Sequence, residues 1–155
     1  MYLEAANKGA FAAQRYLAGA YLAGNGVSKD PQQAAKWMRL AAEHGDAEQE
    51  CNLAVLYQTG TGVQQSLDDA MIWYQKAAEQ GHLRAQHNLG TLYGNAKGTK
   101  QDFVAAYKWL LLSLRGGYKE SQQGLDWLKT HQMTAEQIAE AELQADQWTR
   151  SHGAH

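Results

Sequence analysis

A pattern of residue types that recurs every 36 residues is the feature that most constrains the fold of this chain. Five positions of the pattern keep the same residue in three successive copies: Leu17, Leu53 and Leu89; Tyr21, Tyr57 and Tyr93; Gly26, Gly62 and Gly98; Trp37, Trp73 and Trp109; Gly45, Gly81 and Gly117. A period of 20 to 50 residues is typical of stacked repeats, in which each unit buries its apolar face against its neighbours. We therefore expect a stack of repeats with one continuous core.

Each repeat is predicted to form two antiparallel helices, a first helix A and a second helix B. Apolar residues follow helical spacing in both helices of the central repeat: Ala47, Leu53, Ala54, Leu56 and Tyr57 in A; Ala70, Trp73, Tyr74, Ala77 and Ala78 in B. Asp30, Ser66 and Asp102 are residues of the type that caps a helix N-terminus, and they stand 36 apart where helix B should begin. Glycines in the A-to-B loop and at the end of helix B indicate left-handed backbone.

The sequence predicts an all-α fold of about four helix pairs in a single domain, residues 1–150. Its units are a partial repeat at 1–9, repeats at 10–45, 46–81 and 82–117, and a degenerate closing unit at 118–150, followed by a frayed tail at 151–155. Because the chain opens in mid-repeat, either a lone helix caps the N-terminal end or the chain is a piece of a longer protein.

The last two units depart from the pattern. In the third loop Ala96 replaces a glycine and Thr99 replaces a valine, so we expect a different turn there. In the fourth unit Thr134 and Gln137 form a predicted capping box before a final helix. One face of that helix is apolar and the other is polar, as the last repeat of a stack requires.

Composition argues against several classes of function. The net charge of −2 and the pI near 6.3 disfavour a nucleic-acid partner, which would need a basic surface. No apolar run approaches the roughly 18 residues of a membrane span, so we expect no membrane insertion. Cys51 is the only cysteine, and the N-terminus does not have the form of a signal peptide. A cytoplasmic location fits, as does a periplasmic or secreted one if the chain comes from an exported parent.

The central repeat, GDAEQECNLAVLYQTGTGVQQSLDDAMIWYQKAAEQG, resembles the Sel-1-like repeat, a relative of the tetratricopeptide repeat. The likeness lies in the Leu-Ala-x-x-Tyr run, the Gly-x-Gly-Val loop and the Trp-x-x-x-Ala-Ala-x-x-Gly end, and it covers residues 1 to about 150. It implies a right-handed superhelix (solenoid) whose A helices line a concave groove. It also implies a scaffold or adaptor that binds a protein or peptide.

Matching the tetratricopeptide pattern gives the residues that should face this groove. The candidates for partner binding are Arg15, Tyr16, Glu48, Asn52, Val55, Arg84, His87, Asn88 and Thr91, with Cys51 and Trp127 also on that face. Asn52 and Asn88 are suited to bonding a peptide backbone, and Arg15, Arg84 and His87 to holding a carboxylate. Asn at this position also belongs to the repeat pattern, so packing of helix A is an alternative role.

No catalytic or metal-binding motif stands out. His82 and His87 are five residues apart and so lie on different helix faces, and there is no HExxH or Cys-x-x-Cys spacing. Cys51 with His87 would be the one nucleophile and base to consider, whereas a lone helical cysteine is usually an apolar filler. We predict a non-catalytic protein that needs no cofactor or metal and acts on no small-molecule substrate. The alternatives are an inhibitor or immunity-type protein that blocks a toxin or enzyme and, from another class, an enzyme.

Overall fold

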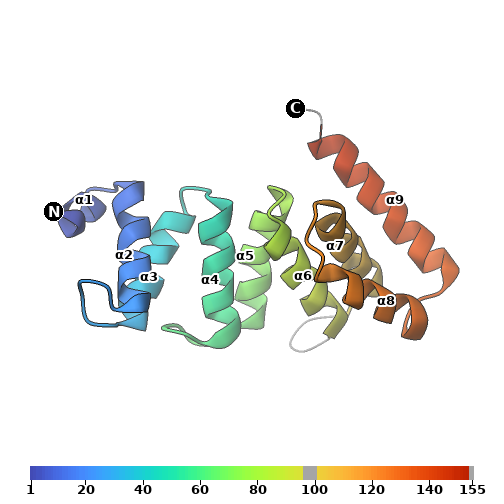
Figure 1. Ribbon diagram of the computed structural model, residues 1–155, viewed down its shortest axis with the longest axis horizontal. Helices are drawn as coiled ribbons and strands as arrows, with labels where there is room; N and C mark the ends of the chain where they lie inside the picture. Colours follow the sequence, from blue (N-terminus) through green and yellow to red (C-terminus); the bar gives the residue numbers. More distant parts are fainter. Residues whose placement is uncertain (96–100, 154–155) are drawn as a thin grey trace. The chain divides into compact units, whose positions relative to one another are not determined.

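The chain is helical throughout the part that the computed structural model describes, residues 1–95 and 101–153, where it contains no strand (Figure 1). The helices are α1 (Tyr2–Asn7), α2 (Phe11–Ala23), α3 (Pro31–Ala42), α4 (Ala47–Thr59), α5 (Leu67–Glu79), α6 (Leu83–Asn95), α7 (Phe103–Arg115), α8 (Ser121–His131) and α9 (Ala135–His152). The predicted A helices are α2, α4, α6 and α8, and the predicted B helices are α3, α5, α7 and α9. The prediction of an all-α repeat of helix pairs is confirmed.

The chain divides into two compact units, unit 1 (Met1–Lys76) and unit 2 (Ala77–His155). Helix α5 begins in unit 1 and ends in unit 2. In unit 1, α2 packs against α1 and α3, and α3 packs against α4. In unit 2, α7 packs against α6, α8 and α9. The single domain predicted for residues 1–150 stays a prediction.

A backbone hydrogen bond closes each A-to-B hairpin at the same place. The amide of the residue that caps helix B donates to the carbonyl of a tyrosine nine positions earlier: Asp30 to Tyr21 at 3.0 Å, Ser66 to Tyr57 at 3.0 Å and Asp102 to Tyr93 at 3.1 Å. Each cap side chain then accepts from a backbone amide in the first turn of its helix, as the sequence predicts. One residue thus ends the loop and starts the helix.

The glycines of the A-to-B loops have the left-handed backbone that their positions predict. Gly60 ends α4 with φ of 72°, and Gly62 follows with φ of 72°. A Cβ on Gly62 would lie 1.9 Å from the carbonyl oxygen of Pro31, the first residue of α3. The loop of the second repeat therefore rests directly on the helix B of the first, and only glycine leaves room for that contact.

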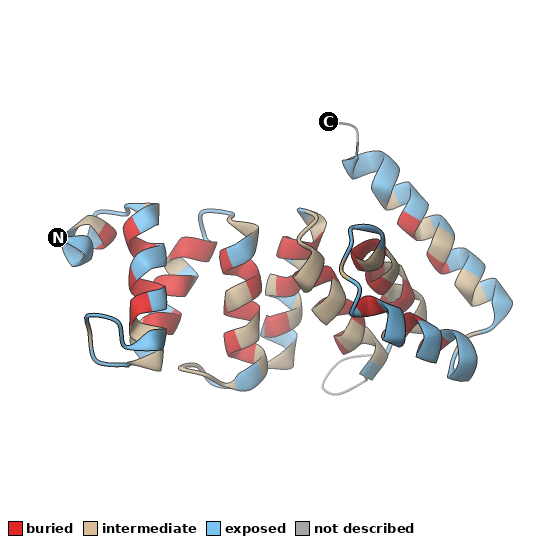
Figure 2. Ribbon diagram, in the orientation of Figure 1, coloured by how far each residue is buried: buried red, intermediate tan, exposed pale blue. Residues whose placement is uncertain are grey.

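Small residues form much of the core and let the helices approach closely. Ala18, Ala34, Ala41, Ala54 and Leu53 are fully buried in unit 1. Buried and exposed positions alternate along its helices (Figure 2). In unit 2 the core around α7 joins Ala106, Tyr107 and Leu110 to Leu125 and Leu128 of α8 and to Ala141 of α9. Most of the stripe positions predicted from the period are buried, while Ala47 and Trp73 are only partly buried.

The tryptophans do not all belong to the core, contrary to the prediction for their repeat position. Trp37 and Trp109 are each 2% exposed, but Trp73 of α5 is only partly buried, with Lys76 Nζ 3.9 Å from the centroid of its ring. Trp127 on α8 is 47% exposed. The same register position holds a core ring in α3 and α7 and a partly buried ring in α5.

The closing unit matches its prediction in its cap and in its two faces. Thr134 and Gln137 form the capping box of α9, whose buried residues are Ala141 and Ala145. Trp148 anchors the helix: its Nε1 donates to Glu79 Oε2 at 2.8 Å and its ring meets that of Trp109 edge-on at 6.1 Å. The helix continues to His152, so the first two residues of the predicted frayed tail are helical and that part of the prediction is wrong. The different turn predicted at Ala96 and Thr99 lies outside the described residues.

None of the helices in the described ranges has the length and hydropathy needed to cross a membrane.

Replacing two glycines of equal φ by alanine should distinguish the cost of backbone strain from the cost of a steric clash with a neighbouring helix. Gly26 and Gly62 both have φ of 72°, but a Cβ on Gly26 would meet nothing within 4 Å. We expect Gly26→Ala to cost about 1 kcal/mol from φ alone and Gly62→Ala to cost at least about 2 kcal/mol. Gly19→Ala, in the exposed interior of α2 with nothing near its Cβ, should be neutral or stabilising. Equal losses at positions 26 and 62, measured by chemical denaturation, would contradict the close contact.

Truncating the tryptophans should rank them by burial. Trp109→Ala removes a ring that is 2% exposed and should lower the free energy of unfolding by about 3–5 kcal/mol. Trp73→Ala should cost clearly less than that, because its ring keeps part of its contact with water in the folded state. Thermal melts of the two variants beside the parent chain test the order, and a greater loss at position 73 would show that the ring is a core residue after all.

Candidate functional site

The predicted partner-binding residues of unit 1 lie on α2 and α4, and most of them reach solvent. Arg15, Tyr16 and Glu48 are exposed, while Asn52 and Val55 are partly buried. Aromatic neighbours hold the two α2 residues: the Arg15 guanidinium lies 5.8 Å from the centroid of the Phe11 ring, and the Tyr16 ring stacks on Tyr2 at 4.1 Å. This part of the surface is exposed and rich in aromatic and charged groups.

In unit 2 the predicted residues Arg84, His87, Asn88 and Thr91 all belong to α6 and are partly buried. Thr91 Oγ1 donates to the carbonyl of His87 at 3.0 Å, so its hydroxyl is bonded within its own helix while its methyl group remains available for apolar contact. These side chains form a surface with fewer protruding groups than that of unit 1.

His87 links α6 to the start of α8. Its Nδ1 lies 2.9 Å from the hydroxyl of Ser121, and its ring is 5.1 Å from that of Tyr118. Loss of hydration on burial lowers the pKa of His87 below its ordinary value of 6.5, and the nearby carboxylate of Glu120 only partly offsets this effect. Nδ1 of the neutral ring and the Ser121 hydroxyl share this hydrogen bond, and the tautomer of His87 sets which of them donates. Ser121 is fully buried, so it offers no nucleophile to a substrate.

A small cavity opens beside these residues on the surface formed by α6 and α8. Thr91, Gly94 and Asn95 line it from α6, Gly124, Trp127 and Leu128 line it from α8, and Leu110 of α7 forms part of its floor. We call it the A-helix cavity. Its volume is about 80 Å³, more than the ~30 Å³ of one water and well below the ~300–1,000 Å³ of a typical small-molecule pocket. Its size and mainly apolar wall suit a single apolar side chain.

Two glycines of α6, at positions 90 and 94, have different roles beside the A-helix cavity. A Cβ on Gly90 would lie 2.8 Å from Leu110 Cγ and 2.9 Å from the Ala106 carbonyl, so Gly90 allows α6 and α7 to pack closely. Gly94 is different, because its Cβ would meet only Ala106 Cβ at an ordinary 3.7 Å. The corresponding positions in the earlier repeats hold Leu22 and Gln58, and the missing side chain leaves the space in which the cavity lies.

Trp127 forms the exposed wall of the A-helix cavity. Its indole is 47% exposed and stacks on the imidazole of His131 at 5.6 Å. The sequence placed Trp127 and Thr91 on the partner-facing surface, and the structure brings both to this one cavity. The sequence did not predict that Gly94, Asn95 and Gly124 would line this cavity. A glycine at position 94, where the other repeats carry a longer side chain, was the signal that could have indicated it.

Cys51 does not have the surface position that its match to the pattern predicts. It is 0% exposed. The role of an apolar filler, considered for a lone helical cysteine, fits its burial. Within the described ranges no group of three or more His, Cys, Asp or Glu residues is arranged to hold a metal ion.

Comparison with protein families identifies the family of the chain. The model of the Sel1 repeat matches residues 11–46, 50–82 and 83–118, more than half of the chain. The chain belongs to the Sel1 repeat family. The matched segments correspond closely to the three complete repeats predicted from the period of 36.

Solved structures of two bacterial proteins share the fold of this Sel1 repeat protein. A Sel1 repeat protein from Oxalobacter formigenes has 30% sequence identity and a TM-score of 0.71, over 81% of this chain and 94% of that one. A protective antigen present in uropathogenic Escherichia coli strains, which displays an SLR fold, has 26% identity and a TM-score of 0.72. That match covers 97% of this chain but only 40% of the longer antigen. No curated protein matches the chain.

Membership of the family gives a general function. Sel1 repeat proteins generally mediate protein–protein interactions and are typically non-catalytic scaffolds. Protein partners are therefore the class that the family supports for this chain.

The lowered pKa of His87 predicts that acidification weakens unit 2. Below pH 6.5 the unfolded chain takes up a proton at His87 that the folded chain resists, so the stability present above pH 6.5 is lost as the pH falls through the lowered folded-state pKa. We expect the apparent Tm of His87→Asn to fall less than that of the parent chain between pH 7.5 and pH 5. Parallel slopes for the His87→Asn variant and the parent would contradict the prediction.

Proposed function

We propose that this Sel1 repeat protein is a non-catalytic adaptor that holds a segment of a partner protein on the exposed surface of its A helices. In unit 2 an apolar side chain of the partner enters the A-helix cavity between α6 and α8. The observation on which the proposal rests is the pairing of this cavity with the half-exposed Trp127 at its edge. General membership of an interaction family supports the class of partner, and the cavity supports the position.

The chemistry of the A-helix cavity favours a peptide segment over a free small molecule. Its lining residues are all uncharged, and Leu110 and Leu128 give it an apolar floor. Tryptophan is one of the residues that most often dominates the binding energy of protein interfaces, especially beside a pocket that the partner fills. An exposed indole next to a side-chain-sized hollow therefore has the form of an anchoring point.

The polar groups around the cavity suit the backbone of such a segment. Asn95 is exposed at the C-terminal end of α6, and Gln123 is exposed on α8 one turn before Trp127. Their amide groups each supply donors and an acceptor, which match the N–H and C=O groups of an extended chain. On this proposal Asn88, Arg84 and His87 lie farther along the same helix α6 and contact residues that flank the anchored side chain.

Site-specific cross-linking tests the position and the class of partner together. A photo-reactive benzoylphenylalanine at position 123, beside the cavity, should attach one protein from a lysate of the host organism. The same group at position 147, exposed on α9, serves as the matched control. Adding Trp127→Ala should abolish the product at position 123, since loss of a hot spot of about 2 kcal/mol weakens binding roughly 30-fold.

The outcomes of this experiment are distinct. Equal capture at positions 123 and 147, or capture that persists in the Trp127→Ala variant at an unchanged melting temperature, would reject the A-helix cavity as the contact. The captured protein could be an enzyme whose activity falls in proportion to the amount of Sel1 repeat protein added. That result would identify the Sel1 repeat protein as an inhibitor that uses this same surface.

A further inference from the structure

A second surface with a defined chemistry lies in unit 1 and is centred on α3, a B helix. Residues 32, 35, 36, 39 and 40 follow the spacing i, i+3, i+4, i+7 and i+8, so they share one face of α3. Gly62 and Val63, in the loop that rests on Pro31, lie over this face. We call the region the α3 surface.

Two adjoining cavities make up the α3 surface, and they share Arg39 and Val63. The first has a volume of about 300 Å³ and a mainly apolar wall that includes Ala35, Leu40 and Val63. The second has about 540 Å³ and a mainly polar wall that includes Gln64 and Ser66. Arg39 therefore stands between an apolar hollow and a polar one.

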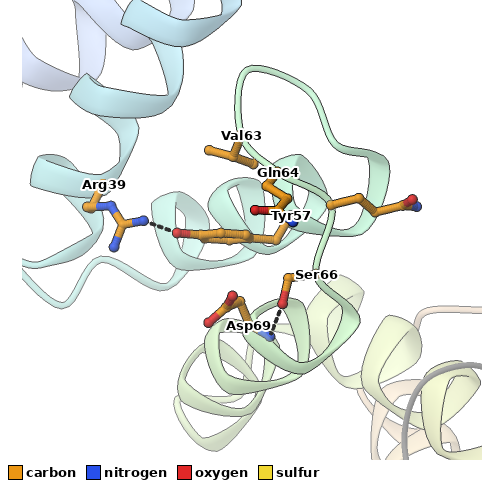
Figure 3. Close-up of a pocket in the computed structure, with 7 residues that line it drawn as sticks. Arg39, Tyr57, Val63, Gln64, Ser66 and Asp69 are labelled. Carbon is orange, nitrogen blue, oxygen red and sulfur yellow. Dashed lines mark hydrogen bonds between the residues drawn. The ribbon is translucent and has the colours of Figure 1, made fainter.

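A buried tyrosine holds the Arg39 guanidinium in place (Figure 3). An Nη of Arg39 donates to the hydroxyl of Tyr57, and the guanidinium carbon lies 5.6 Å from the centroid of the Tyr57 ring. Tyr57 is only 8% exposed, and its carbonyl also accepts the amide of Ser66, so the ring is fixed by the hairpin itself. Guanidinium has five N–H donors, and the bond to Tyr57 leaves donors for a further partner.

Lys36 adds a second positive charge on the same face, one turn before Arg39. Both side chains are exposed, and they are the two charged residues among those that line the apolar cavity. Within the described ranges neither forms a salt bridge with a carboxylate of the chain. Asp69 lies in the polar cavity instead, where its backbone amide is capped by Ser66 Oγ at 3.1 Å. Arg39 thus lines both cavities, whereas Lys36 lines only the apolar one.

The repeat pattern does not require these cations. The position of Lys36 holds Ile72 and Lys108 in the next two repeats, and the position of Arg39 holds Gln75 and Leu111. The two charges occur together only in the first of the three B helices. A general packing role would call for similar residues in all copies, so the pair is particular to this surface.

We propose that the α3 surface binds an acidic peptide segment of a partner protein, in which an Asp or Glu stands next to an aliphatic residue. The carboxylate pairs with Arg39 and Lys36, and the aliphatic side chain occupies the cavity over Ala35, Leu40 and Val63. Charge complementarity selects the acidic group, since a carboxylate accepts two parallel hydrogen bonds from guanidinium. Asp69 disfavours a second acidic residue at the polar end. The proposal adds a contact on a B helix to the one proposed for the A helices.

Titration of the full chain, labelled with ¹⁵N, with defined peptides tests the proposal. The probes are blocked tetrapeptides, acetyl-Gly-Glu-Leu-Gly-amide and its Leu-Glu isomer. At least one should give saturable shifts of the amides of Lys36, Arg39 and Val63. Replacing Glu by Gln or Leu by Gly in that probe should each weaken binding at least about 5-fold, and added salt should weaken the binding of the Glu probe.

Matched variants separate a specific contact from general charge attraction. Arg39→Gln should weaken binding of the probe about 10-fold, and Tyr57→Phe, which removes the hydroxyl that positions Arg39, should weaken it less. Arg150→Gln removes an exposed cation of α9 and should leave the affinity unchanged. Equal loss in the Arg39→Gln and Arg150→Gln variants would reject the site.

Three further results would overturn the proposal. The first is the absence of saturable shifts with either probe, and the second is equal affinity for the Glu and Gln probes. The third is that inorganic phosphate produces the same shifts at the same concentration as the peptide, which would show a simple anion site with no use for the apolar cavity.

Discussion

The hydrogen bond from the cap of each helix B to the carbonyl of a tyrosine in the preceding helix A is the interaction on which the rest of the structure depends. It fixes where the loop ends and where the next helix starts in three successive hairpins. The tyrosine that supplies the carbonyl also supplies a side chain, and in α4 the hydroxyl of the buried Tyr57 accepts a hydrogen bond from the exposed Arg39. A backbone constraint of the fold thereby sets the position of a charged group at a candidate binding surface.

Both candidate surfaces arise where one repeat departs from the others while the frame is kept. The A-helix cavity lies where Gly94 replaces a longer side chain, and the α3 surface lies where Lys36 and Arg39 occur together, as a pair found in one copy alone. The leucine shared by all three copies, at positions 17, 53 and 89, is buried in each of them. In a repeat protein the common residues build the scaffold, and the exceptions are where a specific partner can be recognised.

The sequence was sufficient for the helices, caps and left-handed glycines, because these follow from local chemistry repeated at a constant period. The sequence did not predict how far individual side chains are buried. Cys51 matches a surface position but is covered, and Trp73 matches a core position but is partly open, because exposure depends on which neighbours flank a given copy. Neither surface could be assembled from sequence alone, since each joins residues from different helices. The bond between Arg39 and Tyr57, 18 positions apart, had no signal in the period.

The local closure of each hairpin has a consequence for how such a chain can change in evolution. The tyrosine and its cap stand nine residues apart in all three copies, so a single insertion between them would break the closing bond. Gain or loss of a whole block of 36 residues leaves every such bond intact. Related proteins with this fold are thus expected to differ in the number of repeats more readily than in loop length. Recombination at the boundaries of repeats would give a new combination of surfaces while keeping every closing bond.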